Sequence, residues 1–145
     1  MADIGPFSGE TLMSILPFDD RDGFIWLNGK MLPWRDARLH VLSHGLHYGG
    51  AVFEGERAYA GKIYKSREHS ERFRKSAELV DFEIPYTPEQ LCAAKQAVID
   101  ANGGGDLYVR PVAWRGSEMM AVAAQNATIH VAIAVWAWPS MFDIN

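Results

Sequence analysis

Apolar and polar residues alternate along the first part of the chain, and a period of two predicts strands. Residues 24–34 hold two short apolar runs separated by Asn28 and Gly29, the pair that favours a tight hairpin turn. Residues 52–64 predict a second hairpin, with its tip at residues 60–62. The His- and Gly-rich segment between them, residues 40–50, predicts a tight turn or one short helical turn.

The period then changes to that of a helix. Over residues 66–82, Phe73, Ala77 and Val80 share one face, and Ser66 is expected to cap the start.

A second helix has a clearer beginning. Thr87 is followed by Pro88 and Gln90, which is a capping-box pattern with proline in the first turn. Apolar positions then repeat every three to four residues until Asn102 and Gly103, a typical helix stop.

Two strands are expected to close the chain, at residues 106–115 and 128–138. Hairpins dominate and strands do not alternate with helices, so the pattern predicts an α+β fold with a mostly antiparallel sheet and two helices. We interpret residues 1–22 as an N-terminal arm, 23–137 as one small α+β domain, and 138–145 as the start of a connection between domains.

Composition narrows the function classes. The 145 residues are 48% hydrophobic, which supports a sizeable core, and the net charge of -4 does not favour binding to nucleic acid or to an anionic membrane. A single cysteine, no long apolar run and no signal-peptide pattern predict a cytoplasmic protein. Residues 136–142 are strongly apolar, which indicates either a C-terminal strand in the core or a chain from which a further segment has been cut off.

The histidines of the central turn do not predict a metal site. His44 and His47 lie three residues apart, but a zinc site needs three or four ligands, and no HExxH pattern is present. We expect these side chains to hydrogen-bond to backbone groups, and we predict no bound metal.

Two arginines are open to more than one interpretation. Alternation places Tyr108 and Arg110 on the same face of a strand, where an unpaired buried guanidinium is costly. Arg110 is therefore expected either to pair with Glu54 or Glu56 across the sheet or to receive an anionic ligand. By spacing alone, Arg72 is expected to form a surface ion pair with the glutamate one helical turn before it.

Five segments, in order along the chain, resemble the class IV pyridoxal-phosphate-dependent aminotransferases, most closely the branched-chain amino acid type. They are SHGLHYG at 43–49, VFEGER at 52–57, REHSERF at 67–73, YVRP at 108–111 and WAW at 136–138. The resemblance implies a fold like the small domain of these enzymes, with pyridoxal 5′-phosphate as cofactor and a homodimer as the assembly.

The resemblance also implies roles for particular residues. Arg72 matches the arginine that binds the cofactor phosphate, for which a planar guanidinium fork is well suited. Phe53, Gly55, Tyr108, Arg110 and Trp138 match residues that line the substrate pocket, and Gly55 would let a ligand approach the backbone. Tyr48, Met120 and Val122 match residues that each subunit of the family contributes to its neighbour's site.

Other features of the family are not matched. The residue at 141 is Met, where the family commonly has Tyr, and none of the five lysines lies in a motif like that of the Schiff-base lysine. In the family, that lysine lies in the large domain, so we predict no catalytic residue in this chain and expect the 145 residues alone to be inactive.

We interpret the chain as the N-terminal domain of a branched-chain amino acid aminotransferase, truncated before its large domain. That enzyme would transfer an amino group between Leu, Ile or Val and 2-oxoglutarate. The alternatives are a D-amino acid aminotransferase, an aminodeoxychorismate lyase, or a non-enzymatic module for dimerisation or ligand binding.

Overall fold

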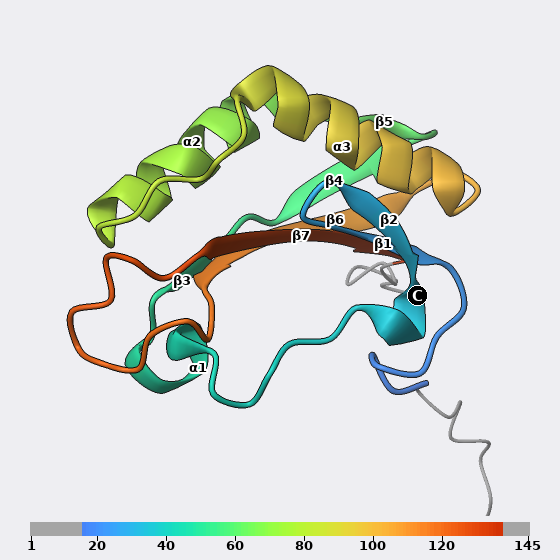
Figure 1. The fold of residues 1–145 in the computed structure, drawn as a ribbon. Helices are drawn as coiled ribbons and strands as arrows, with labels where there is room; N and C mark the ends of the chain where they lie inside the picture. The colour runs from blue at the N-terminus through green and yellow to red at the C-terminus, as the bar shows by residue number, and fades with distance from the viewer. Residues whose placement is uncertain (1–15, 138–145) are drawn as a thin grey trace, which may run out of the picture.

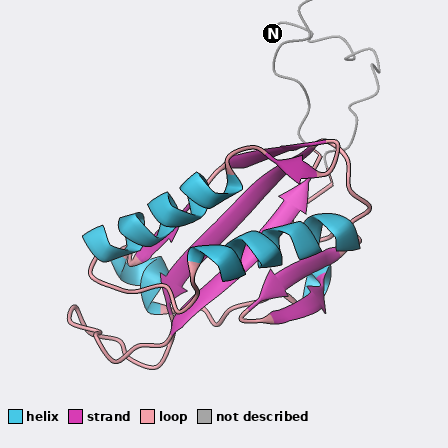
Figure 2. Cartoon of the chain, turned by 90° about the horizontal axis from the view of Figure 1, so that it is seen from above, coloured by secondary structure: helices cyan, strands magenta, loops and turns pink. Residues whose placement is uncertain are grey.

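The computed structural model describes residues 16–137, in which two long helices cover one face of an antiparallel sheet (Figure 1). The helices are α2 (Ser66–Leu79) and α3 (Pro88–Ala101), and both lie over the strands when the molecule is seen from above (Figure 2). The opposite face carries only a 3-10 helix, η1 (Trp34–Asp36), the short helix α1 (His44–Tyr48) and loops among the described residues.

The sheet is built from seven strands, and every pairing is antiparallel. Its order is β2-β1-β7-β6-β4-β5, and β3 also pairs with β6. The strands are β1 (Phe24–Leu27), β2 (Lys30–Pro33), β3 (Ala51–Phe53), β4 (Glu56–Tyr59), β5 (Lys62–Ile63), β6 (Leu107–Arg115) and β7 (Ile129–Trp136). The predicted α+β class with a mostly antiparallel sheet is confirmed.

The hydrophobic core lies between this sheet and the two helices. Residues of β6 alternate strictly between buried and half-buried, so Val109 faces the core while Arg110 faces away from it. Phe73 of α2 and Val98 of α3 are at most 1% exposed against the sheet. Burial of each such side chain contributes roughly 1.5–3 kcal/mol, so this layer dominates the stability of the domain.

Local chemistry fixes several elements as predicted. Asn28 and Gly29 both have positive φ, 50° and 90°, as a type I′ hairpin turn requires. Thr87 accepts a hydrogen bond from the Gln90 amide, and the Gln90 side chain accepts one from Thr87 in return. The central turn contains α1, one short helix, also as expected.

Other expectations were wrong. Ser66 is not the cap of α2, because the helix begins after Lys65, which has a left-handed backbone conformation. Val80 lies beyond the helix and is 40% exposed. The second hairpin is confined to β4 and β5, because β3 ends at Phe53 and pairs separately with β6.

The aromatic end of β7 is better covered than its composition suggested. Trp136 is half-buried. Its ring packs edge-on against Phe18, with 5.2 Å between the ring centroids, and at a tilt of 45° against Tyr108, with 4.9 Å between the centroids. Residues 138–145, and with them Trp138 and Met141, lie outside the described residues.

Candidate functional site

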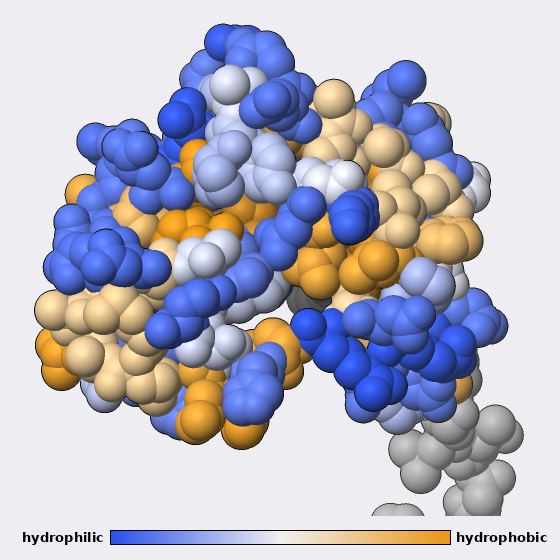
Figure 3. Space-filling view, viewed as in Figure 1, coloured by the Kyte–Doolittle hydropathy of each residue, from blue (hydrophilic) through white to orange (hydrophobic). Residues whose placement is uncertain are grey.

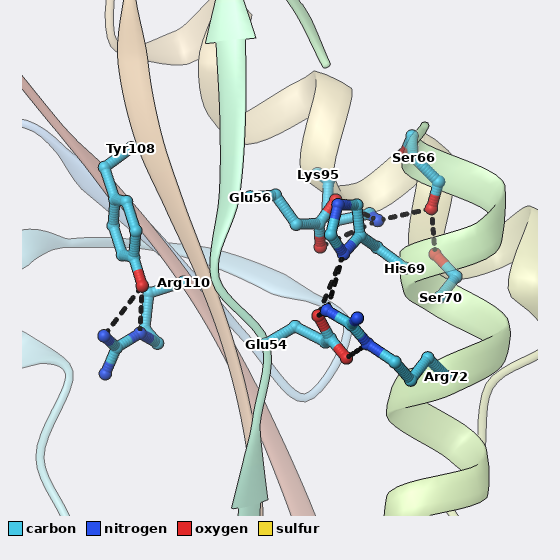
Figure 4. A network of polar contacts seen from close by, with 9 residues as sticks. All are labelled: Glu54, Glu56, Ser66, His69, Ser70, Arg72, Lys95, Tyr108 and Arg110. Carbon is cyan, nitrogen blue, oxygen red and sulfur yellow. Dashed lines mark hydrogen bonds and ion pairs between the residues drawn. The ribbon is translucent and has the colours of Figure 1, made fainter. Parts of the chain in front are cut away.

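The short segment between β3 and β4 directs successive side chains to opposite faces of the sheet. Glu54 and Glu56 are buried on the helix side, whereas Phe53 and Gly55 are exposed on the other side. The Glu54 amide donates to the Pro111 carbonyl at 3.0 Å, which ties the segment to β6. Figure 4 shows a polar group on each side of it, one around Glu54 and the other formed by Tyr108 and Arg110.

On the helix side, Glu54 holds Arg72 through a two-pronged ion pair. Arg72 donates from Nε to Oε1 and from Nη2 to Oε2, both at 2.7 Å, and His69 donates from Nδ1 to Oε2 at 2.9 Å. His69 and Arg72 lie three residues apart on α2, so both reach the same carboxylate. The expected surface pair between Arg72 and Glu68 is therefore wrong.

The Glu54 side chain is 4% exposed, whereas that of Arg72 is 65% exposed. Burial alone would raise the pKa of Glu54, but the hydrogen bonds from Arg72 and His69 outweigh it and lower that pKa below its ordinary value of 4.5. Glu54 is therefore ionised at neutral pH.

A second carboxylate, Glu56, forms a buried ion pair with α3. Lys95 donates to its two oxygens at 3.0 and 2.7 Å and to the Ser66 carbonyl at 2.9 Å. Burial raises the pKa of Glu56, and the neighbouring Lys95 ammonium opposes that rise. The contacts join α3 and the first turn of α2 to β4.

Glu54 and Glu56 thus form their ion pairs with residues of the helices, and neither pairs with Arg110. Arg110 instead donates to the Tyr108 hydroxyl from Nη2 at 2.8 Å and from Nε at 3.2 Å. Its guanidinium carbon lies 4.2 Å from the centroid of the Phe53 ring, in cation–π contact. Within residues 16–137 no carboxylate pairs with Arg110, so of the two alternatives the cross-sheet ion pair is wrong, and an anionic ligand remains a prediction.

Gly55 makes room for a side chain of the protein itself. A Cβ at this position would lie 2.4 Å from the Tyr108 hydroxyl oxygen, so any larger residue would displace the phenol that supports Arg110. The close approach expected at Gly55 therefore belongs to Tyr108 in the structure, and approach of a ligand to the backbone remains a prediction.

Next to Arg110, the uncovered face of the sheet forms a hollow of about 310 Å³. Its floor consists of apolar side chains from β1, β6 and β7, and Leu46 of α1 and Leu39 stand at its rim. The hollow opens beneath the sheet in Figure 3. Arg110 is thus a half-buried cation at the edge of an apolar space, which suits a ligand with a carboxylate and a hydrocarbon side chain.

Tyr48, Met120 and Val122 lie near one another although about 70 residues separate the first from the other two in the sequence. They are 48%, 42% and 85% exposed. His44 connects their two segments, because its ring stacks on Tyr48 at 4.6 Å and its Nε2 donates to the Ala121 carbonyl at 2.7 Å. The expectation that this histidine bonds to the backbone is confirmed, but its link to the late loop could not be foreseen.

His47 likewise bonds to a backbone carbonyl, that of Val41, at 2.9 Å. Among residues 16–137, no group of three or more His, Cys, Asp or Glu side chains is placed to hold a metal ion. No helix in the same range has both the length and the apolar character required to cross a bilayer.

Sequence reasoning considered Glu54 only as a partner of Arg110 and missed both its pairing with Arg72 and the role of His69. Glu54 and His69 lie inside the family-like segments VFEGER and REHSERF. The signal was the three-residue spacing of His69 and Arg72, which places two donors on one helix face and calls for a shared acceptor.

Comparison with known proteins agrees with this arrangement. Residues 51–143 match the family model described as amino-transferase class IV. A probable branched-chain-amino-acid aminotransferase of Rickettsia bellii is 45% identical over 118 residues, which are 81% of this chain and 40% of the relative.

Solved structures show the same fold. The Escherichia coli branched-chain amino acid aminotransferase superposes with a TM-score of 0.77 at 36% identity, over 81% of this chain and 40% of that one. The T.th. branched-chain amino acid aminotransferase, complexed with N-(5′-phosphopyridoxyl)-L-glutamate, gives 0.76 at 41% identity, over 81% and 42%. The chain thus spans about two fifths of the length of these relatives.

Proposed function

Because the chain belongs to the class IV aminotransferase family, we propose that it forms the small-domain half of a branched-chain amino acid aminotransferase site. Together with a lysine-bearing domain, it would transfer an amino group between Leu, Ile or Val and 2-oxoglutarate. The observation that carries the proposal is the placement of two cations, Arg72 and Arg110, on either side of the Phe53–Glu56 segment.

The residues on the helix side fit pyridoxal 5′-phosphate. Arg72 presents an exposed guanidinium whose Nη1 makes no hydrogen bond within residues 16–137, and a planar fork of this kind binds phosphate oxygens well. When bound, the cofactor supplies an electron sink for bonds at the α-carbon of the amino acid. The T.th. relative complexed with a phosphopyridoxyl glutamate supports this cofactor for the present chain.

The residues on the open face fit the two kinds of substrate. The apolar hollow suits a branched side chain, and Arg110, which lines it and contacts the Phe53 ring, suits the second carboxylate of glutamate or 2-oxoglutarate. Tyr108 orients the guanidinium through its hydroxyl. Trp138 remains a proposed wall of the same pocket, as the family resemblance implies.

A second copy of the chain is part of the proposal. Tyr48, Met120 and Val122 form an exposed apolar group at one end of the molecule, and Figure 3 shows apolar atoms gathered there. We assign these three residues to the neighbouring subunit's site.

The test is a chimera in which residues 24–142 replace the corresponding segment of the T.th. enzyme, whose known structure defines the junctions. Amino transfer is then measured with L-leucine and L-glutamate, with D-amino acids, and with aminodeoxychorismate. Activity with the two L-amino acids supports the proposal. A folded chimera that accepts only D-amino acids or aminodeoxychorismate indicates a sister enzyme, and a folded chimera without activity indicates a binding module.

A further inference from the structure

Arg72 lies on an exposed helix surface, where a long side chain ordinarily samples many rotamers. Ordering such a side chain on binding a ligand reduces affinity, because its conformational entropy is lost at that moment. In this structure Arg72 is already held, since both Nε and Nη2 are bonded to Glu54 at 2.7 Å.

The carboxylate that holds Arg72 is itself buried and fixed by hydrogen bonds. Glu54 lies at the end of β3 with its carboxylate 4% exposed, and its backbone amide is bonded to Pro111. His69 bonds to the same carboxylate, so three N–H groups fix its two oxygens (Figure 4). The lowered pKa of Glu54 keeps the acceptor ionised at neutral pH.

The geometry of the pair leaves the outer edge of the guanidinium available. A guanidinium has five N–H donors, and a carboxylate bound at Nε and Nη2 takes two of them. Nη2 also lies 3.3 Å from His69 Nδ1, but that nitrogen donates its hydrogen to Glu54 and therefore does not accept one. Both N–H groups of Nη1 and the outer one of Nη2 therefore remain, on the side of the guanidinium that faces away from Glu54. They form a second fork that matches two oxygens of a phosphate.

We propose that Glu54 is a positioning residue that holds Arg72 with this outer fork directed at the phosphate of the cofactor. The inference rests on the proposed function, in which Arg72 binds that phosphate. Glu54 itself touches no ligand and acts only through Arg72.

The experiment measures binding of pyridoxamine 5′-phosphate to the 145-residue chain by calorimetry at about pH 7.5, where Glu54 is ionised. This probe has no aldehyde, so it does not react with lysine side chains, and pyridoxamine without the phosphate isolates the contribution of that group. The variants are Arg72→Met, Glu54→Gln and the double variant. Glu56→Gln is the matched control, since it alters a buried carboxylate two residues away that does not contact Arg72.

Glu54→Gln is expected to weaken binding about ten- to a hundredfold, the order of effect seen when a residue that orients a metal ligand is removed. Its amide would turn an N–H toward one of the two Arg72 donors, so the fork cannot form. In the Arg72→Met background the same change should have no further effect, because Glu54 acts through Arg72. Glu56→Gln should bind as the wild type does, although it unfolds more easily.

A second readout does not depend on binding. NMR relaxation of the Arg72 Nε–H group should report a rigid side chain in the wild type and in Glu56→Gln, and a flexible one in Glu54→Gln. If Glu54→Gln does not fold, Arg72→Lys replaces it, because lysine keeps the charge on an exposed helix position but cannot form the fork.

The outcomes separate the two proposals. If Arg72→Met binds the probe as tightly as the wild type, both the phosphate role of Arg72 and the inference fail. The inference alone fails if Arg72→Met weakens binding of the probe but Glu54→Gln leaves it unchanged. It also fails if Glu54→Gln strengthens binding, as removal of a negative charge near the phosphate could do. Equal losses from Glu54→Gln with and without Arg72 would show a general structural role and would also overturn it.

Discussion

Arg110 is supported by aromatic residues and a phenol hydroxyl instead of a carboxylate, and this arrangement has consequences for specificity. A carboxylate partner would neutralise the guanidinium and reduce its attraction for an acidic substrate. Contact with Phe53 and the bond to Tyr108 hold the side chain without removing its charge.

Arg110→Met, introduced into the chimeric enzyme, should therefore affect the two substrates unequally. The expected loss in kcat/KM for glutamate is about ten- to a thousandfold, which corresponds to ~1.4–4 kcal/mol. This range overlaps the ~2–5 kcal/mol that is lost when one partner of a buried charged pair is removed. Leucine should be affected much less, since it has no second carboxylate. The two half-reactions, followed by the absorption of the cofactor, provide the measurement. Equal losses for both substrates would show that Arg110 binds the α-carboxylate they share.

Glu54 also makes stability depend on pH in a definite direction. Its pKa in the folded chain is lowered below 4.5, so the unfolded chain takes up a proton first as the pH falls. The stabilisation by Glu54 is complete above that ordinary value and is lost as the pH falls through the folded-state pKa. The gap in unfolding free energy between wild type and Glu54→Gln should therefore be largest near neutral pH and should close below pH 4.5. Urea titrations at several pH values would measure it, and a gap that persists at low pH would contradict this account.

The sequence could predict part of this site but not its ion pairs. Strand alternation placed Tyr108 and Arg110 on one face, as the structure has them. The partner of Arg72 could not be found in the same way, because Glu54 lies 18 residues earlier and its approach depends on how α2 packs on β3. Local spacing favoured Glu68, and the tertiary contact with a buried carboxylate overrides it.

At the scale of elements, α3 is attached to the sheet by a charge as well as by its apolar face. Lys95 and Glu56 are 1% and 0% exposed, and each is the other's ionic partner. Removal of one charge from such a pair leaves the other buried and uncompensated.

Lys95→Met should therefore lower the free energy of unfolding by roughly 3–5 kcal/mol. The double variant Lys95→Met/Glu56→Leu should recover most of this loss, because apolar side chains of similar volume replace the pair. Chemical denaturation of the three proteins is the measurement. If Lys95→Met lowered the free energy of unfolding by less than about 1 kcal/mol, the ion pair would be screened by solvent as a surface pair is, and its burial in the structure would be contradicted.

Elements whose limits depend on local chemistry were predictable. The Asn28–Gly29 turn and the Thr87 capping box each require only neighbouring residues, and both formed as expected. The start of α2 did not follow its local signal, since the Ser66 carbonyl is bonded to Lys95 and the turn before it is made by Lys65. The break between β3 and β4 likewise depends on pairing with β6.

At the scale of the whole molecule, the two faces of the sheet differ. One is covered by α2 and α3 (Figure 1), and the other carries an apolar hollow with exposed apolar residues at one end. The order of strands and helices predicted the layered fold, but the open face could not be predicted, because residues buried by a partner have the same pattern as residues of a core.

We expect the chain to associate through this end of the molecule. Sedimentation at micromolar concentration should show a dimer or a larger species. Val122 is 85% exposed, so Val122→Glu should shift the equilibrium toward the monomer without unfolding the chain. Tyr64→Glu is the matched control, since Tyr64 is 62% exposed directly after β5, which lies far from the late loop in Figures 1 and 2. A monomeric wild type would contradict the proposed interface.

The side chains of the segment from Phe53 to Glu56 alternate between the two faces of the sheet, so this one segment contacts both proposed ligand-binding arginines. Glu54 holds the proposed phosphate anchor on one face, and its neighbours Phe53 and Gly55 frame the proposed carboxylate anchor on the other. The separation of the two anchors is therefore set by a single stretch of backbone bonded to β6. In the proposed enzyme this segment would fix the distance between Arg72 and Arg110, and it would therefore select ligands whose phosphate and second carboxylate lie that far apart. Closure of another domain could bring reactive groups to the ligand, but it would leave the distance between its two ends unchanged.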